Sequence, residues 1–139
     1  MEVISTEEGQ LTTPDSQQLY TKTWKAATEQ PKARLVFVHG FSDHCNLYEP
    51  LFRTLAQQGI TVYSWDQRGW GRSVHVPAQK GRTGPTAQVM ADITTFINSL
   101  PASEEDVPLF LMGHSMGGAE VLVYAATGPK PVLSKIRGT

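Results

Sequence analysis

Ser115 is the residue whose neighbours most clearly indicate chemistry. It lies in a Gly-His-Ser-Met-Gly motif at 113–117 that a further glycine extends. Glycines two positions before and after a serine fit a tight strand-to-helix turn, because they relieve close backbone contacts and let the hydroxyl enter a cleft. We therefore expect Ser115 to be a nucleophile that attacks an acyl carbon. The alternative is a glycine-rich turn that only packs a helix against a sheet.

Two backbone amides are candidates for stabilising the negative charge that such an attack creates. One is the amide of Met116, which directly follows the nucleophile at the start of a helix. The other lies in the loop after an earlier strand, where Val-His-Gly-Phe-Ser-Asp-His occupies 38–44, and Phe41 is the best-placed residue. The residues expected to support this turn and loop are Gly113, His114, Gly117, Gly118, His39 and Gly40.

The histidines are weaker candidates for the general base that a serine nucleophile needs. At position 39 a structural, hydrogen-bonding histidine is favoured over a base, and His114 is also expected to be structural and to point away from the serine. His44 is open between lining the cleft and lying in a solvated loop. His75 has no evident partner. The single cysteine, Cys45, is expected to be a buried apolar residue, with a reactive thiol as the alternative.

The loop Asp-Gln-Arg-Gly-Trp-Gly-Arg-Ser at 66–73 is interpreted as a polar, glycine-rich turn. Its charged residues, Asp66, Arg68 and Arg72, could cross-link the loops beneath the site. Asp66 precedes the serine in the chain, so we do not assign it as the acid of a catalytic triad.

The elements that must position these residues alternate along the chain. Period-two alternation predicts an outer strand at 18–26. Continuous apolar runs predict buried strands at 34–40, 60–69 and 109–113. Helical spacing predicts helices at 46–59, 85–100 and 116–128, with Pro50 and Pro85 in first turns. This order predicts an α/β domain with a mostly parallel sheet, whose chemistry lies at the carboxyl ends of the strands.

Composition narrows the classes of function. The chain has 139 residues, 40% of them hydrophobic and 18% charged, and a net charge of −1, which fits one globular domain and gives no reason to expect nucleic acid as a partner. No apolar run approaches the length of a membrane span, and the acidic start lacks the pattern of a signal peptide. One cysteine excludes an internal disulfide. A cytoplasmic location fits best, with association with lipid droplets or membranes left open.

Together, the His-Gly loop, the Asp-x-Arg-Gly-x-Gly-x-Ser loop and Gly-His-Ser-Met-Gly-Gly resemble the α/β-hydrolase superfamily. The stretches 36–73 and 108–118 are most similar to its monoacylglycerol lipase branch, also called serine aminopeptidase-like or lysophospholipase-like. The resemblance implies an α/β-hydrolase fold with helices on both sheet faces. It also implies hydrolysis of a carboxylic ester, such as a monoacylglycerol or lysolipid, through an acyl-enzyme on Ser115. Neither a metal nor an organic cofactor is expected. Oligomeric state and peripheral membrane contact are left open.

The resemblance fails for the residues that activate the serine. In the family, an acid and then a histidine follow the nucleophile. Here residues 116–139 contain no Asp and no His, and their one carboxylate is Glu120. We therefore expect a polar segment at 1–17 and, at 18–139, the N-terminal part of a hydrolase domain truncated after the serine-bearing helix. The strand before Ser115 would then be an exposed edge. The alternative to an incomplete hydrolase is an inactive binding or regulatory form. A weaker alternative is that another histidine of the chain serves as a substitute general base.

Overall fold

A computed structural model describes residues 3–139 of the chain as one mixed six-stranded sheet with helices on both faces. The sheet order is β1-β2-β4-β3-β5-β6. The strands are β1 (Thr6–Thr12), β2 (Gln18–Trp24), β3 (Ala33–Val38), β4 (Ile60–Trp65), β5 (Leu109–Gly113) and β6 (Ile136–Gly138). The helices are α1 (Glu49–Gln57), α2 (Thr86–Asn98), α3 (Met116–Thr127) and the short α4 (Lys130–Leu133).

The parallel core of the sheet consists of β4, β3, β5 and β6, and it brings the carboxyl ends of β3, β4 and β5 to one edge. β2 runs antiparallel to β4, and β1 runs antiparallel to β2. The loops that leave β3, β4 and β5 are the three that the sequence assigns to the site. Their convergence is therefore a consequence of the parallel strand direction.

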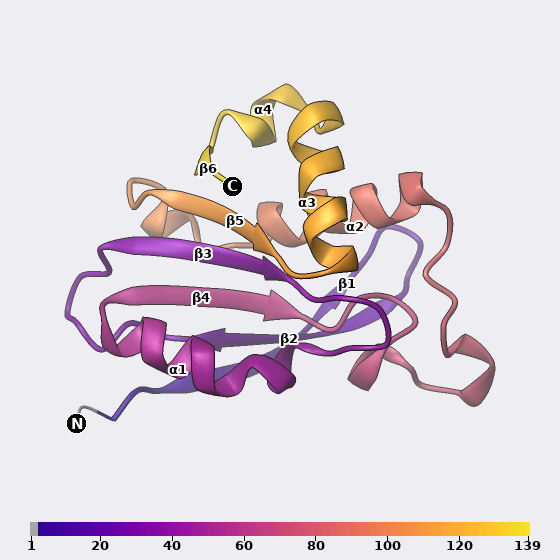
Figure 1. The fold of residues 1–139 in the computed structure, drawn as a ribbon, viewed down its shortest axis with the longest axis horizontal. Coiled ribbons are helices and arrows are strands. Elements are labelled where there is room, and N and C mark those ends of the chain that lie inside the picture. Colours follow the sequence, from indigo (N-terminus) through magenta and orange to yellow (C-terminus); the bar gives the residue numbers. More distant parts are fainter. Residues whose placement is uncertain (1–2) are drawn as a thin grey trace.

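Two apolar layers enclose the sheet. Alternate side chains of β3 face opposite ways, so Val36 and Val38 join a core with α2 and α3, whereas Leu35 and Phe37 join a core with α1. Figure 1 shows α1 in front of the sheet and α2 behind it. This arrangement confirms the expected mostly parallel α/β architecture with helices on both faces.

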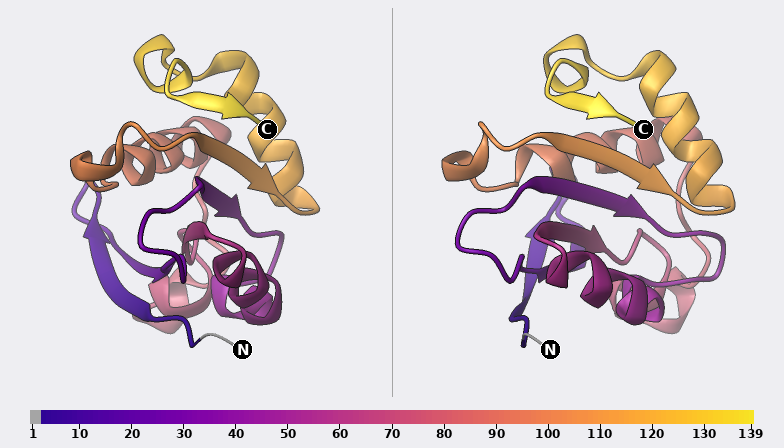
Figure 2. Two further views of the ribbon diagram at one scale, coloured as in Figure 1. Left: turned by 90° about the vertical axis from the view of Figure 1, so that its left-hand side faces the viewer. Right: turned by 60° about the vertical axis from the view of Figure 1, so that its left-hand side comes forward.

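Three details of the sheet differ from the sequence predictions. The strand predicted at 18–26 is not the outer one, because β1 pairs with it along seven residues and forms the edge. The strand before Ser115 is not an edge either, because β6 lies beyond it and pairs with Leu109 and Phe110. Figure 2 shows β6, in yellow, lying beside β5. Pro85 precedes α2 as its N-cap instead of lying in its first turn.

No helix within residues 3–139 is long and apolar enough to cross a membrane. Pro50 lies in the first turn of α1, as predicted, where its missing N–H has no intrahelical acceptor to lose.

Candidate active site

Ser115 occupies the turn between β5 and α3, where it is the N-cap of the helix. Its backbone angles are φ 58° and ψ −124°, a region that L-residues rarely adopt. The side chain is exposed, and its hydroxyl makes no hydrogen bond to any residue in 3–139. A strained serine with a free hydroxyl is the geometry that the glycine-flanked motif predicts.

The two flanking glycines of the motif are required by space. A β-carbon on Gly113 would collide with the backbone of Gly117, and a β-carbon on Gly117 would collide with the carbonyl groups of Val38 and His39. The third glycine differs, because a β-carbon on Gly118 would meet nothing closer than 3.4 Å, an ordinary contact. The structure therefore explains Gly113 and Gly117 by close packing, whereas Gly118 has room for a side chain.

The loop after β3 lies directly against the serine. A β-carbon built on Gly40 would be 3.2 Å from the β-carbon of Ser115, and the amide of His114 donates to the carbonyl of Val38 at 3.2 Å. The amides of Phe41 and Met116 donate no hydrogen bond to any described residue. Gly40 thus lies against Ser115, and the residue that follows each of them, Phe41 and Met116, has a free backbone N–H donor.

His39 is held as a neutral structural residue. Its Nδ1 bonds the carbonyl of Gly40 at 2.8 Å, and its Nε2 accepts the amide of Gln67 at 2.8 Å. Because a carbonyl can only accept, Nδ1 carries the proton. Burial lowers the pKa of His39, which favours this neutral form. Both ring nitrogens are occupied, so this geometry does not leave His39 free to act as a base.

The 66–73 loop cross-links the site, as its charged residues suggested. The buried Asp66 carboxylate accepts the amides of Cys45 and Arg72, both at 2.8 Å. Arg68 reaches further, with its guanidinium bonded to the buried Asp92 of α2 at 2.9 Å and to Asp15 at 2.7 Å. The hydrogen bond from Arg68 is the main cause of the lowered pKa of Asp15. These contacts tie the loops after β1, β3 and β4 to one another and to α2.

A polar chain of three side chains ends at His114, the residue before the nucleophile. The Tyr48 hydroxyl donates to Asp43, and it lies 3.2 Å from Nδ1 of His114, the residue before Ser115. Because the single hydroxyl proton is used on Asp43, Nδ1 of His114 is the donor to Tyr48. Burial and the Asp43 carboxylate raise the pKa of Tyr48 to about 12, so the phenol stays protonated. Sequence reasoning missed Tyr48, which carries no motif of its own.

The other two histidines and the cysteine are also placed. His44 is half-buried and lines a cavity of about 380 Å³ with Asp43 and Trp70, and Ser115 is not among the residues that line this cavity. His75 does have a partner, contrary to expectation, because its Nε2 lies 2.9 Å from the carbonyl of Gln18. Cys45 is fully buried, and burial raises the pKa of its thiol, so a reactive thiol is not supported.

One contact across the site could not be read from the motifs. The Gln67 side-chain amide donates both to the carbonyl of His39, at 2.8 Å, and to the carboxylate of Glu120 in α3, at 3.2 Å. Burial raises the pKa of Glu120. Gln67 therefore joins the loops after β3 and β4 to the serine-bearing helix, a bond between positions that only the fold brings together.

Comparisons with known proteins agree with this geometry. A family model described as serine aminopeptidase, S33, matches residues 29–136. The Schizosaccharomyces pombe protein named "Putative monoglyceride lipase" is 45% identical over 111 residues, which cover 79% of this chain and 29% of that protein. The human protein named "Monoglyceride lipase" is 32% identical over 119 residues, which cover 86% of this chain and 38% of that protein.

A solved structure gives the same result for the fold. The crystal structure of a soluble variant of monoglyceride lipase from Saccharomyces cerevisiae, in complex with a substrate analog, superposes with a TM-score of 0.82 at 26% identity. The match covers 99% of this chain and 43% of that one. The chain thus spans less than half the length of each of these three relatives.

Proposed function

We propose, from the premise that this chain belongs to the serine aminopeptidase S33 family of monoglyceride lipase-like α/β hydrolases, that Ser115 is the nucleophile of a carboxylic-ester hydrolase. The observation that carries the proposal is the turn itself. Its strained Ser115 presents a free hydroxyl against Gly40, and the free amides of Phe41 and Met116 belong to the neighbouring residues. Strain at this position has a use if the hydroxyl must be displayed to a substrate.

The proposed reaction follows from these groups. The Oγ of Ser115 attacks the acyl carbon, the carbonyl oxygen becomes an oxyanion, and the amides of Phe41 and Met116 donate to it. The N-terminal end of α3, which begins at Met116, adds a favourable partial positive charge. The alcohol leaves, and water then hydrolyses the acyl-enzyme to the free acid. None of these steps needs a metal or an organic cofactor.

The substrate that we propose is a monoacylglycerol or lysolipid. The hydrogen-bonded side chains of Asp43, Tyr48 and His114 end at the residue before the serine, and polar groups of this kind suit the hydroxyls of a polar leaving group. Phe41 lies in the loop after β3 and Leu47 lies just after that loop, and their exposed fractions are 68% and 62%. Exposed apolar side chains near the site favour peripheral contact with a lipid surface, where such substrates reside.

A second candidate function is a binding or regulatory form without turnover. It is favoured by one specific observation, that no histidine within residues 3–139 hydrogen-bonds to Ser115. A serine hydroxyl without a general base is a poor nucleophile, and loss of the base lowers catalysis by several orders of magnitude. We therefore propose that Ser115 in this chain alone reacts slowly, and that the limiting factor is the base and not the oxyanion donors.

Chemical rescue separates the two candidates. The purified chain is incubated with a fluorophosphonate probe, with and without added imidazole, and labelling at Ser115 is followed by mass spectrometry over time. Imidazole can take the hydroxyl proton while the serine oxygen bonds to phosphorus and fluoride leaves. We expect imidazole to accelerate labelling by at least about tenfold, because a positioned general base contributes roughly 10²–10⁴-fold in enzymes and a free one contributes less.

The controls make the result specific to the proposed site. Ser115→Ala should abolish labelling, and Ser42→Ala, which removes another exposed serine of positive φ, should not change it. The 1,3-dimethylimidazolium ion, which has no free nitrogen lone pair and cannot accept a proton, should have no effect at the same concentration. Labelling of wild type that is no faster than that of Ser115→Ala, with or without imidazole, would favour the non-catalytic form.

A further inference from the structure

Arg34 is a buried cation at the opposite end of the sheet from Ser115. It is the second residue of β3 and is paired in register with Leu109 at the start of β5, whereas Ser115 follows the carboxyl end of β5. Only 5% of Arg34 is exposed. It lines a cavity of about 350 Å³ together with the end of α2, the 101–106 loop and residues 134–137.

The guanidinium of Arg34 is incompletely satisfied. Its Nε donates to the carbonyl of Val107 at 3.0 Å, but its two Nη groups donate to no residue within 3–139. No carboxylate of these residues forms an ion pair with it. The Nη groups are not enclosed, because the described side-chain N and O atoms that are fully buried without a partner are the indole nitrogens of Trp65 and Trp70. The Nη groups are therefore accessible donors for a ligand in the cavity that Arg34 lines.

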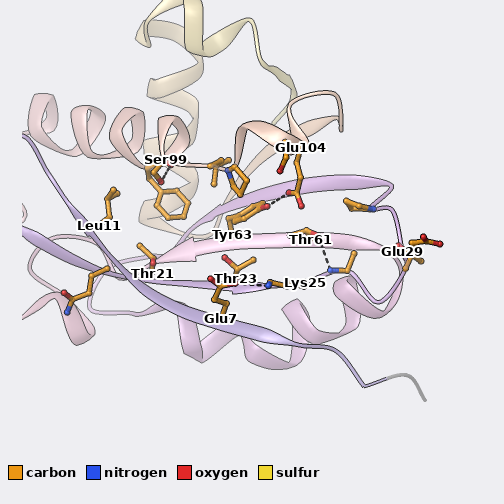
Figure 3. Close-up of a pocket in the computed structure, with 18 residues that line it drawn as sticks. Glu7, Leu11, Thr21, Thr23, Lys25, Glu29, Thr61, Tyr63, Ser99 and Glu104 are labelled. Atoms are coloured by element: carbon orange, nitrogen blue, oxygen red, sulfur yellow. Dashed lines mark hydrogen bonds and ion pairs between the residues drawn. The ribbon is translucent and has the colours of Figure 1, made fainter.

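A neighbouring, larger cavity differs from the Arg34 cavity in how its polar groups are bonded. A cavity of about 530 Å³ lies between β1, β2, β4 and the end of α2, and Leu100 and Pro101 line both cavities. Figure 3 shows that the one cation among its lining residues, Lys25, is bonded to Glu7, and that Tyr63 is bonded to Glu104. The unsatisfied donors therefore belong to the smaller, Arg34 cavity.

We propose that the Arg34 cavity binds a small phosphate-type oxyanion, such as inorganic phosphate or a phosphomonoester. Two exposed cations, Lys135 and Arg137, line the cavity with Arg34, and Ser134 adds a hydroxyl. Cations from β3, from the segment before β6 and from β6 suit an anion with oxygens on several sides, and guanidinium groups bind phosphate in a fork geometry.

Negative groups on the other wall limit the size of this anion. Glu105 and Asp106 line the cavity, and α2 ends there at Asn98, which adds a partial negative charge. A large polyanion would meet these groups, whereas a small anion can stay beside Arg34. This site is independent of the proposed hydrolase activity, so either proposal can fail without the other.

Isothermal titration of the full chain with inorganic phosphate tests the site, with chloride used to hold the ionic strength constant. We expect saturable binding to one site. Arg34→Gln should weaken it by about tenfold or more, because hydrogen bonds to a buried charged group are strong. Lys135→Gln and Arg137→Gln should each weaken it by about threefold, as exposed charges do. Arg82→Gln removes an exposed cation elsewhere and should leave binding unchanged.

Several outcomes would overturn the proposal. These are an absence of saturable binding, binding that is undiminished in the Lys135→Gln, Arg137→Gln double variant, or acetate binding as tightly as phosphate. The double variant keeps the test decisive if Arg34→Gln does not fold, because both its sites are exposed and should not disturb the core. Glycerol 3-phosphate, titrated in parallel, shows whether the site accepts a phosphomonoester or only the free ion.

Discussion

Gly117→Ala and Gly118→Ala form a matched pair that tests how the serine turn is packed. At position 117 the added methyl would collide with the Val38 carbonyl oxygen and would lie 2.8 Å from its carbonyl carbon, so α3 must move away from β3. At position 118 the nearest atom is 3.4 Å away and nothing must move. Both changes gain helix propensity, by up to about 1 kcal/mol.

The net effect of packing cost and helix propensity on the free energy of unfolding differs at the two positions. Forcing a methyl into a closely packed contact costs about 1–3 kcal/mol, and here the obstacle is backbone that cannot rotate away, so the upper end applies. Gly117→Ala should therefore lower the free energy of unfolding by about 2 kcal/mol, whereas Gly118→Ala should raise it by about 0.5 kcal/mol. At roughly 3 °C per kcal/mol for a chain of this size, the two melting temperatures should differ by about 7 °C.

Thermal unfolding followed by far-UV circular dichroism measures this difference, and imidazole-assisted labelling of Ser115 gives a second readout. Because Gly117 packs against the loop that leads to Phe41, Gly117→Ala should also slow labelling, while Gly118→Ala should not. Equal melting temperatures, or a more stable Gly117→Ala variant, would refute the reasoning that close approach to Val38 requires glycine at this position.

Three further predictions concern strain, pH and ion pairing. Ser115→Gly should raise the free energy of unfolding by about 1 kcal/mol, because glycine adopts positive φ freely, and Ser115→Ala should not; equal urea midpoints would show that the turn is unstrained. Burial raises the pKa of Glu120 in the folded chain above its ordinary value of 4.5. Wild type should therefore lose stability as the pH rises from 4.5 through the folded pKa, because the folded state disfavours the ionised carboxylate. Glu120→Gln cannot ionise and should be more stable at pH 7 by less than about 1 kcal/mol, with no advantage at pH 4; an advantage independent of pH in denaturation curves would contradict this. Arg68→Met should cost about 3 kcal/mol, because it leaves the buried Asp92 without its ion pair, whereas Arg72→Met, at an exposed pair, should cost less than about 1 kcal/mol; similar losses in urea would argue that the Arg68 network is not special.

The strands that are covered on both faces were the parts of the fold most accessible to sequence reasoning. Leu35 to Val38 is a continuous apolar run that is buried on both faces, as predicted. Leu109 to Met112 is also a continuous apolar run in the parallel core, but the prediction of a strand buried on both faces is wrong there, because Leu109 and Leu111 are buried whereas Phe110 and Met112 are exposed. The turn at Ser115 was equally accessible from its motif, although only the requirement for glycine at 113 is local to the turn, whereas glycine at 117 is required by the approach of β3. Where covering layers or local backbone geometry determine a feature, the residue types themselves carry the signal.

β1 shows why another part of the fold was missed. Its sequence, Thr-Glu-Glu-Gly-Gln-Leu-Thr, has no apolar alternation, and six of its seven residues are exposed. It forms a strand because it pairs with β2 along its whole length, not because it buries a face. An edge strand of this kind leaves no periodic pattern, so it falls within the segment interpreted as polar. Its glutamates also discourage pairing of the edge with another chain.

The histidines show the same limit at the site, and they also explain what kind of activation Ser115 lacks. A histidine's role depends on which groups its two nitrogens meet, and those groups come from distant positions. The amide of Gln67 lies 28 residues beyond His39, and the hydroxyl of Tyr48 lies 66 residues before His114. Where a ring nitrogen already has a partner, using it as a base for Ser115 would require breaking that contact. The strain and the free amides at the turn are set by its own backbone, so they form whether or not a base is near. Imidazole from solution can therefore supply the missing base to a serine and oxyanion donors that are already in place. The labelling rate of Ser115 with imidazole then measures how much reactivity these backbone features support.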